Sequence, residues 1–219
     1  METKSKNKFA KIFNVSRETI EILCRYSELI CQANASLNLI SKKSVDNIWI
    51  RHFADSAKLF FLIKENLPKE EISELKICDV GSGAGFPGAI VQLMLQQFKL
   101  KWKIDLIESV AKKCSFLESL KVKLNLNFSI INKRCENIKD PYDIIMCRAV
   151  APLKDLIPII SNISHPKTIH FLSKGKKWRA ELNEIKNKWQ FNLDVVNNNK
   201  SIDDSGGVVL IMRDLGKKK

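Results

Sequence analysis

One stretch of the chain, residues 76 to 88, limits its possible folds more than any other. It reads Lys-Ile-Cys-Asp-Val-Gly-Ser-Gly-Ala-Gly-Phe-Pro-Gly, so a short apolar run breaks into four glycines within eight residues. An apolar helical pattern begins at Ala89, which predicts a buried strand, a tight turn and a helix N-terminus. Glycines let backbone approach a ligand closely in such a turn. The stretch therefore indicates an α/β unit with a nucleotide-like ligand.

The glycine spacing leaves more than one ligand class open. Gly83, Gly85 and Gly88 satisfy G-x-G-x-x-G, which also occurs in dinucleotide-binding enzymes that hold a pyrophosphate on a helix N-terminus. Asp79 places a carboxylate beside the loop, where it would repel a pyrophosphate, and Pro87 removes one N–H donor from the turn. A nucleoside that carries positive charge fits better, and S-adenosylmethionine is such a ligand. A loop that only turns the chain is the alternative.

The charge of the chain points to an anionic partner. Its 219 residues include 37 basic and 24 acidic side chains, for a net charge of +13. RNA, DNA and a membrane surface are all compatible with this excess, and so is simple solubility. Charge alone does not decide between them.

Cysteine usage and hydropathy bear on the compartment. The six cysteines form no C-x-x-C pair and most lie in apolar contexts, which predicts a reduced intracellular chain without a metal site. The charged N-terminus leads into no signal-peptide core, and no apolar run approaches the ~18 residues of a membrane span. We expect a soluble, cytoplasmic protein.

Two helices are predicted before the glycine stretch. Residues 1 to about 9 read as a disordered basic tail, and Ser16 is a plausible N-cap for a helix over about 17–33. A second apolar face recurs at spacings of three and four from Val45 to Phe60. The charged segment Pro68 to Glu74 reads as a linker. We expect a helical N-terminal extension over 1–70 and an α/β domain over 71–219.

Polar residues interrupt the apolar face of the second helix. His52 and Ser56 lie on that face, and Arg51 and Asp55 pair at i,i+4. Because buried polar groups need partners, one interpretation is that Asp55 or a backbone carbonyl of the next domain satisfies His52. The other is that this face closes over a ligand or substrate cleft.

Strands and helices alternate from residue 76 to 189, which predicts a parallel sheet with helices on both faces and a final hairpin-like pair of strands. Ligands bind at the carboxyl ends of such strands. The strands are expected at about 77–80, 103–107, 128–131, 142–147, 168–172, 191–196 and 207–212.

The carboxyl ends of these strands carry the candidate ligand contacts. Glu108 ends the second strand, where such folds hydrogen-bond a ribose diol, although a surface carboxylate is the alternative. Lys112 and Lys113 follow at the edge of the cleft or on a solvated face. Arg148 ends the fourth strand, where it serves a ligand or an interdomain ion pair, and Lys174 follows the fifth.

The motifs together resemble a known family. They are Asn38-Leu39-Ile40, Arg51-His52-Phe53-Ala54-Asp55-Ser56, the glycine stretch with its Phe-Pro-Gly extension, Ser-Phe-Leu at 115–117, Arg148-Ala149 and Lys174-Gly175. In this order they resemble the small-subunit ribosomal RNA guanine-N7 methyltransferases, the RsmG or GidB family, from about residue 15 to 213. The resemblance implies a Rossmann-like class I S-adenosylmethionine-dependent methyltransferase fold over 71–219.

The resemblance also implies an activity and a set of site residues. The activity is methylation of guanine N7 in the 530 loop of 16S rRNA (guanine 527 in standard rRNA numbering), on free rRNA or on the small ribosomal subunit. Separately from the resemblance, we expect a monomer. The cofactor residues carried over from the family are Gly81, Phe86, Glu108, Cys135, Glu136 and Arg148. Our hypothesis for RNA contacts is Lys112, Arg134 and Lys174, with Arg148. Cys135 and Val150 depart from the family, which more often shows Val or Ala and Phe there.

The expected chemistry needs no general base. Guanine N7 has an in-plane lone pair, so methyl transfer is an in-line displacement in which alignment supplies on the order of 7 to 11 kcal/mol. We expect no catalytic triad, paired carboxylates or metal, and Arg148 is the best candidate to orient the guanine. Two other classes remain: a noncatalytic nucleic-acid-binding protein, and a dinucleotide-dependent oxidoreductase.

Overall fold

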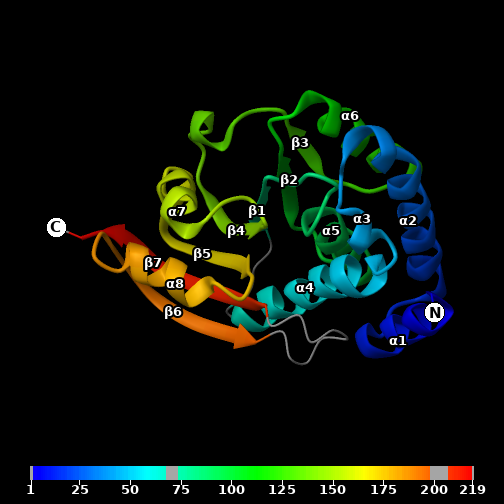
Figure 1. The fold of residues 1–219 in the computed structure, drawn as a ribbon, viewed down its shortest axis with the longest axis horizontal. Helices are drawn as coiled ribbons and strands as arrows, with labels where there is room; N and C mark the ends of the chain where they lie inside the picture. The colour runs from blue at the N-terminus through cyan, green and yellow to red at the C-terminus, as the bar shows by residue number, and fades with distance from the viewer. Residues whose placement is uncertain (1, 68–73, 198–206, 219) are drawn as a thin grey trace.

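The computed structural model describes residues 2–67, 74–197 and 207–218 (Figure 1). Its centre is one seven-stranded sheet in the order β3-β2-β1-β4-β5-β7-β6. β7 pairs antiparallel with both neighbours, and the other pairings are parallel. The strands are β1 (Lys76–Val80), β2 (Lys103–Ile107), β3 (Ser129–Ile131), β4 (Tyr142–Arg148), β5 (Ser164–Lys174), β6 (Trp189–Asn197) and β7 (Val208–Lys217).

Helices cover both faces of the sheet (Figure 1). One face packs against α5 (Gly88–Gln97), α6 (Ala111–Leu124) and the N-terminal helices, which share one apolar cluster with it. The other packs against α7 (Leu153–Ser161) and α8 (Trp178–Ile185). The parallel sheet with a final antiparallel pair is confirmed, and each predicted strand overlaps an observed one.

The predicted disordered tail is wrong, because residues Glu2–Phe13 form helix α1. Phe9 and Phe13 are one helical turn apart and both are buried. The ring of Phe9 lies 5.7 Å from that of Trp49, edge to face. The segment was not predicted as a helix because polar and charged residues outnumber its apolar residues. Burial of the two aromatic rings nevertheless stabilises the helix.

Helix α2 (Arg17–Leu37) begins at its predicted cap, since the Ser16 hydroxyl accepts a hydrogen bond from the Thr19 amide. The second predicted helix is divided into α3 (Lys42–Val45), the π-helical segment η1 (Trp49–Ala54) and α4 (Asp55–Asn66). The wider π turn changes the direction of side chains along the apolar face, and such turns often occur at functional sites. Here it holds Arg51 and His52.

The N-terminal helices share one apolar cluster with the sheet and with α5. Phe53 and Phe60 belong to the same buried set as Ile77 and Met94. Residues 68–73 of the expected linker lie outside the described residues, and the expected boundary near residue 70 falls among them. The helices that precede this segment therefore form part of the packing that supports β1.

Candidate active site

The glycine loop between β1 and α5 is held by the N-terminal helices. The Tyr26 hydroxyl donates a 2.6 Å hydrogen bond to the Ala84 carbonyl, and its ring stacks on Phe86 at 5.4 Å. Gly85 has φ +92°, and a Cβ there would collide with the Tyr26 hydroxyl. Glycine is therefore required by both the backbone conformation and the close approach of Tyr26.

Asp79 supports the loop from beneath and does not face the ligand side, contrary to the expectation that it would attract a cation. Its Oδ2 accepts a 2.9 Å hydrogen bond from the Gly88 amide at the N-terminus of α5. Its Oδ1 has no hydrogen-bond partner among the described residues. Burial raises the pKa of Asp79 to about 7, although the bond from Gly88 opposes the shift. The side chain is fully buried between β1 and α5.

A narrow cavity of about 110 Å³ lies where β2 and β3 end. Glu108, Arg134, Cys135 and Glu136 line it together with Gly81 and apolar side chains of β2 and α7. Glu108 is buried and accepts hydrogen bonds from the amides of Gly83 at 2.9 Å and Val110 at 2.8 Å. The two bonds fix the carboxylate against the glycine loop, and each oxygen keeps acceptor capacity.

A second cavity of about 430 Å³, the loop cavity, lies against the glycine loop. Gly81, Phe86 and Arg148 line it, as do Arg51 and His52 from η1. Arg51 and His52 thus face a cavity, as the second interpretation of this helix face expected, and that the cavity holds a ligand or substrate stays a prediction.

Lys113 lines the loop cavity, whereas Lys112, the predicted RNA contact, is exposed and is not among the lining residues. The packing of Cys114 and Leu117 sets the rotation of α6. Successive helical residues differ by about 100°, so adjacent lysines face different directions.

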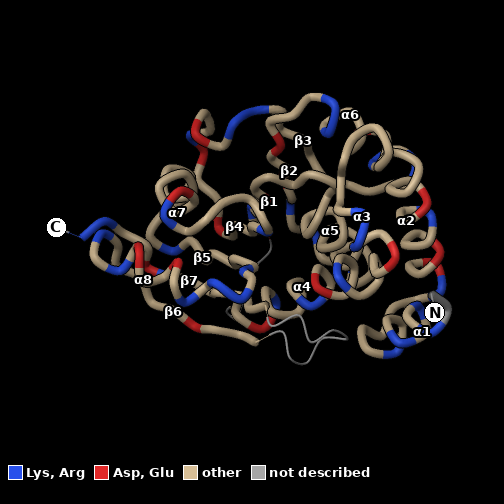
Figure 2. Tube along the Cα trace, in the orientation of Figure 1, with Lys and Arg blue, Asp and Glu red and all other residues tan. Residues whose placement is uncertain are grey.

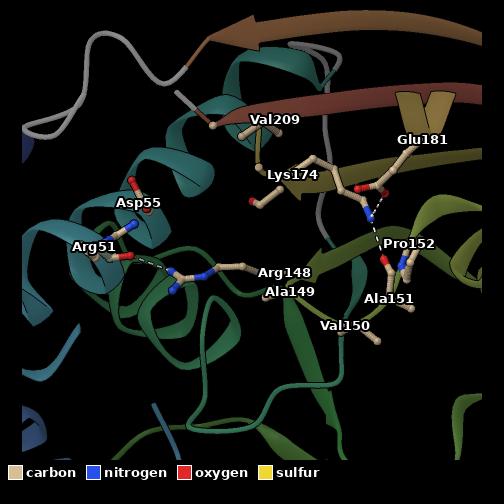
Figure 3. A pocket seen from close by; sticks show the side chains of 13 residues that line it. Arg51, Asp55, Arg148, Ala149, Val150, Ala151, Pro152, Lys174, Glu181 and Val209 are labelled. Carbon is tan, nitrogen blue, oxygen red and sulfur yellow. Dashed lines mark hydrogen bonds and ion pairs between the residues drawn. The ribbon is translucent and has the colours of Figure 1, made fainter. Parts of the chain in front are cut away.

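The third, outer cavity has a volume of about 470 Å³ (Figure 3). Arg51, Asp55 and Arg148 lie on one side of it, and Lys174 and Glu181 lie on the other. Lys174 donates to the Ala151 carbonyl at 2.6 Å and to the Glu181 carboxylate at 2.8 Å, and its side chain is only 9% exposed. Its ammonium is thus already paired, which does not suit the expected contact with an RNA phosphate.

Arg148 stands at the junction of the outer and loop cavities. Its Nη1 donates a 2.9 Å hydrogen bond to the Arg51 carbonyl, and its Nη2 contacts Nδ1 of His52. The guanidinium also lies over the Phe86 ring, 5.9 Å from its centre. Burial lowers the pKa of Arg148, but Asp55 and Asp79 favour the charged form. The side chain is therefore a cation held in one orientation.

His52 contacts both Arg148 and Phe86. Its ring stacks on Phe86 at 4.8 Å. Burial, with the charges of Arg148 and Arg51, lowers the pKa of His52 to about 3, so the imidazole is neutral at pH 7. We assign Nδ1 as the acceptor because it faces the guanidinium, which leaves the hydrogen on Nε2. The partner of His52 is thus an arginine side chain, which neither interpretation of the sequence named.

The three cavities are contiguous. The narrow and loop cavities share Gly81, the loop and outer cavities share Arg148 and Ala149, and the narrow and outer cavities share Val150. Ala149 has φ +54°, a left-handed conformation that turns the chain away from β4 at this junction. Arg148-Ala149 is among the motifs that carry the family resemblance, but the left-handed conformation of Ala149 was not predicted from the sequence.

In the described residues no group of three or more His, Cys, Asp or Glu side chains is placed to hold a metal ion. No helix in the described part of the chain is long and apolar enough to cross a membrane.

The sheet order, with cavities at the carboxyl ends of β1, β2 and β4, defines a class I S-adenosylmethionine-dependent methyltransferase fold. Magnesium protoporphyrin IX methyltransferase from Synechocystis, solved with bound S-adenosylmethionine, superposes with TM-score 0.58 at 13% identity, over 86% of this chain and 97% of that one. A putative class I methyltransferase from Listeria monocytogenes gives TM-score 0.57 at 10% identity, over 77% and 61%. These likenesses confirm the predicted fold.

Sequence comparison identifies the particular family within this class. Residues 19–206 match the GidB family, described as rRNA small subunit methyltransferase G, and the chain belongs to that family. The ribosomal RNA small subunit methyltransferase G of Bartonella tribocorum is 36% identical over 214 residues, which cover 96% of this chain and 95% of that protein. The family predicted from the sequence motifs is thereby confirmed.

Proposed function

We propose that this protein transfers the methyl group of S-adenosyl-L-methionine to N7 of a guanine in the 530 loop of 16S rRNA. Membership of the rRNA small subunit methyltransferase G family supports the substrate class. The observation that carries the proposal is the row of three contiguous cavities around Gly81, Arg148 and Val150. Such a row offers separate places for a nucleoside, its charged tail and a target base.

The narrow cavity fits the adenosine half of the cofactor. Its walls combine apolar side chains of β1, β2 and α7 with polar and charged residues that follow β2 and β3. The Glu108 carboxylate, fixed by two backbone amides, would accept hydrogen bonds from the ribose hydroxyls. Cys135 and Glu136 would border the adenine. The Glu108 carboxylate beside the glycine loop thus suits ribose hydroxyls better than a phosphate group.

The loop cavity fits the methionine half of the cofactor. Gly81 and Phe86 line it, and Arg148 presents a guanidinium of the kind that binds a carboxylate through parallel hydrogen bonds. His52 and the Arg51 carbonyl occupy part of that guanidinium and leave its other donors for ligand. The residues present therefore fit S-adenosylmethionine.

S-adenosylmethionine held by Gly81, Glu108 and Arg148 would supply a methyl group on a sulfonium. Guanine N7 would accept that methyl group with its own in-plane lone pair, so no residue of the chain would have to remove a proton. The residues of the chain need only align the reactants, which is worth about 7 to 11 kcal/mol of barrier. The pKa of His52 is lowered to about 3 and its Nδ1 faces Arg148, so the imidazole is a weak base, and methyl transfer to N7 would need none.

The outer cavity fits the target base. Arg148 and Arg51 would donate to guanine O6, and the Asp55 carboxylate would accept from the N1–H and N2–H edge, which leaves N7 clear. Lys112 and Arg134 are exposed beside the cleft and remain our candidates for phosphate contacts. Lys174 we now assign to holding the loop after β4, because it pairs with Glu181 and Ala151.

We further propose that the protein acts in the cytoplasm and as a monomer. A ribosomal RNA substrate supports the compartment. Light scattering on the purified protein measures the oligomeric state.

The proposal is tested by transfer of labelled methyl from S-adenosylmethionine to 16S rRNA and to 30S subunits from a strain that lacks the modification, with the product nucleoside identified by mass. We expect 7-methylguanosine at a single site. RNA binding without methyl transfer would favour a noncatalytic RNA-binding protein, and nicotinamide cofactor binding would favour an oxidoreductase. Comparing free rRNA with 30S subunits identifies the preferred substrate.

A further inference from the structure

A basic groove lies on the molecule apart from the three cavities of the candidate site. It is formed by α7, the C-terminal end of α8, the start of β6 and the end of β7. Its volume is about 510 Å³. Six of its lining residues carry the argument: Lys154, Glu184, Lys188, Trp189, Lys217 and Lys218. The four lysines are exposed, and Trp189 lies at the base with 7% exposure.

The positive charge of this groove is only partly neutralised. Lys154 pairs with Glu184 at 3.8 Å, and both side chains are more than half exposed, so this pair is weak. Lys217 lies 5.9 Å from the centre of the Trp189 ring as a cation–π contact. Lys188 and Lys218 form no ion pair among the described residues. The groove therefore presents at least three lysine charges to a partner.

Basic residues also lie between this groove and the outer cavity. Lys176, Lys177 and Arg179 precede or begin α8, and Lys186 follows it; all four are exposed. Figure 2 shows the blue segments around α8 and the C-terminus. The two acidic residues of α8, Glu181 and Glu184, are each paired with a lysine. The side of the protein along α8 is thus predominantly positive.

The strand β7 relates the groove to the candidate site. Val209 lines the outer cavity and Lys217 lines the basic groove. These residues are eight apart on one strand, a separation of roughly 25 Å at about 3.3 Å per residue. A free nucleotide in the outer cavity cannot reach that far, but a folded RNA can.

We propose that the basic groove is a second RNA-binding surface, which holds phosphates of the substrate at a distance from the methylated base. The inference rests on the proposed function for its substrate. Lysines gathered around an aromatic ring match a phosphate backbone, because each ammonium binds as a point charge and RNA carries one phosphate per nucleotide. Its role is substrate affinity, and it takes no part in the chemical step.

The test is the triple variant Lys188→Glu, Lys217→Glu, Lys218→Glu, compared with wild type and with a matched control, Lys99→Glu, Lys101→Glu, Lys123→Glu. The control lysines are also exposed and make the same change in net charge. Binding to 16S rRNA and to 30S subunits is measured by filter binding from low to high salt, together with methyl-transfer kinetics. Filter binding reports RNA affinity whether or not methyl transfer occurs.

We expect the groove variant to bind RNA about tenfold more weakly near physiological salt, and the slope of log K against log salt to become shallower by roughly 2 to 3. The KM for RNA rises, whereas kcat and the affinity for S-adenosylmethionine stay at wild-type values. The control variant changes the slope by less than half as much.

Two results overturn the inference. One is a groove variant whose salt slope equals that of the control. The other is loss of binding to phosphatidylglycerol vesicles with RNA binding intact, which makes the surface a membrane contact. If the wild-type protein transfers no methyl group, the proposed function is contradicted. The filter-binding comparison still shows whether the basic groove binds RNA.

Discussion

Replacing His52 tests whether the N-terminal helices position Arg148. In His52→Leu the apolar contact with Phe86 is largely kept, but the guanidinium of Arg148 loses one of its two described acceptors. A hydrogen bond to a charged group is worth about 1.5 to 3 kcal/mol. We therefore expect the affinity for S-adenosylmethionine, or kcat/KM, to fall by roughly 10- to 150-fold. Titration calorimetry and methyl-transfer kinetics measure the two quantities.

The matched variant is His52→Asn, whose side-chain oxygen replaces the Nδ1 acceptor and should restore most of the lost affinity. A second control repeats His52→Leu in an Arg148→Met background, where it should cost little because the shared interaction is already absent. Melting temperatures of all variants exclude a folding defect as the cause. The claim that His52 positions Arg148 would be refuted if His52→Leu and His52→Asn lost the same affinity for S-adenosylmethionine. It would also be refuted if His52→Leu lost as much affinity in the Arg148→Met background as in the wild type.

The remaining predictions concern three other side chains. The pKa of Asp79 is raised from 3.8 to about 7, so wild-type stability falls as pH rises from the lower to the higher of these values. Asp79→Asn should therefore gain stability relative to wild type from about pH 4 to pH 7 in urea titrations, and a pH-independent difference would contradict this. Glu108→Gln places an amide against the Gly83 or Val110 N–H, so we expect a higher KM for the cofactor with little change in kcat. Lys174→Ala leaves Glu181 without its cation and should lower the melting temperature. If the variant instead keeps its melting temperature and its RNA binding depends less steeply on salt, Lys174 is an RNA contact after all.

The sheet could be predicted from the sequence because strand and helix periodicities alternate from residue 76 onward. Apolar runs of four to seven residues followed by helical patterns leave few alternatives to a doubly wound parallel sheet. The ends of strands β2 and β4 then brought Glu108 and Arg148 to one edge, as expected of this fold. The strand order alone places these two residues at the same edge of the sheet, so their proximity could be predicted without knowing how their side chains point.

The details that the sequence did not predict depend on which way a side chain points. Asp79 ends a strand in which alternate residues face opposite sides, and its side is the one covered by α5. Lys112 and Lys113 are equivalent in the sequence until the rotation of α6 is known. The contact of His52 with Arg148 joins residues 96 apart, and no local pattern encodes it.

The hydroxyl of Tyr26 touches a loop that the sequence separates from it by 58 residues. Gly85 cannot be replaced even if position 26 becomes smaller, because its φ is +92°, and loss of the Tyr26 hydroxyl would leave the Ala84 carbonyl without its donor. A mutation at Tyr26 in α2 therefore acts directly on the glycine loop. The sequence of α2 is therefore constrained by the glycine loop, because a residue that replaces Tyr26 must still support the backbone of that loop.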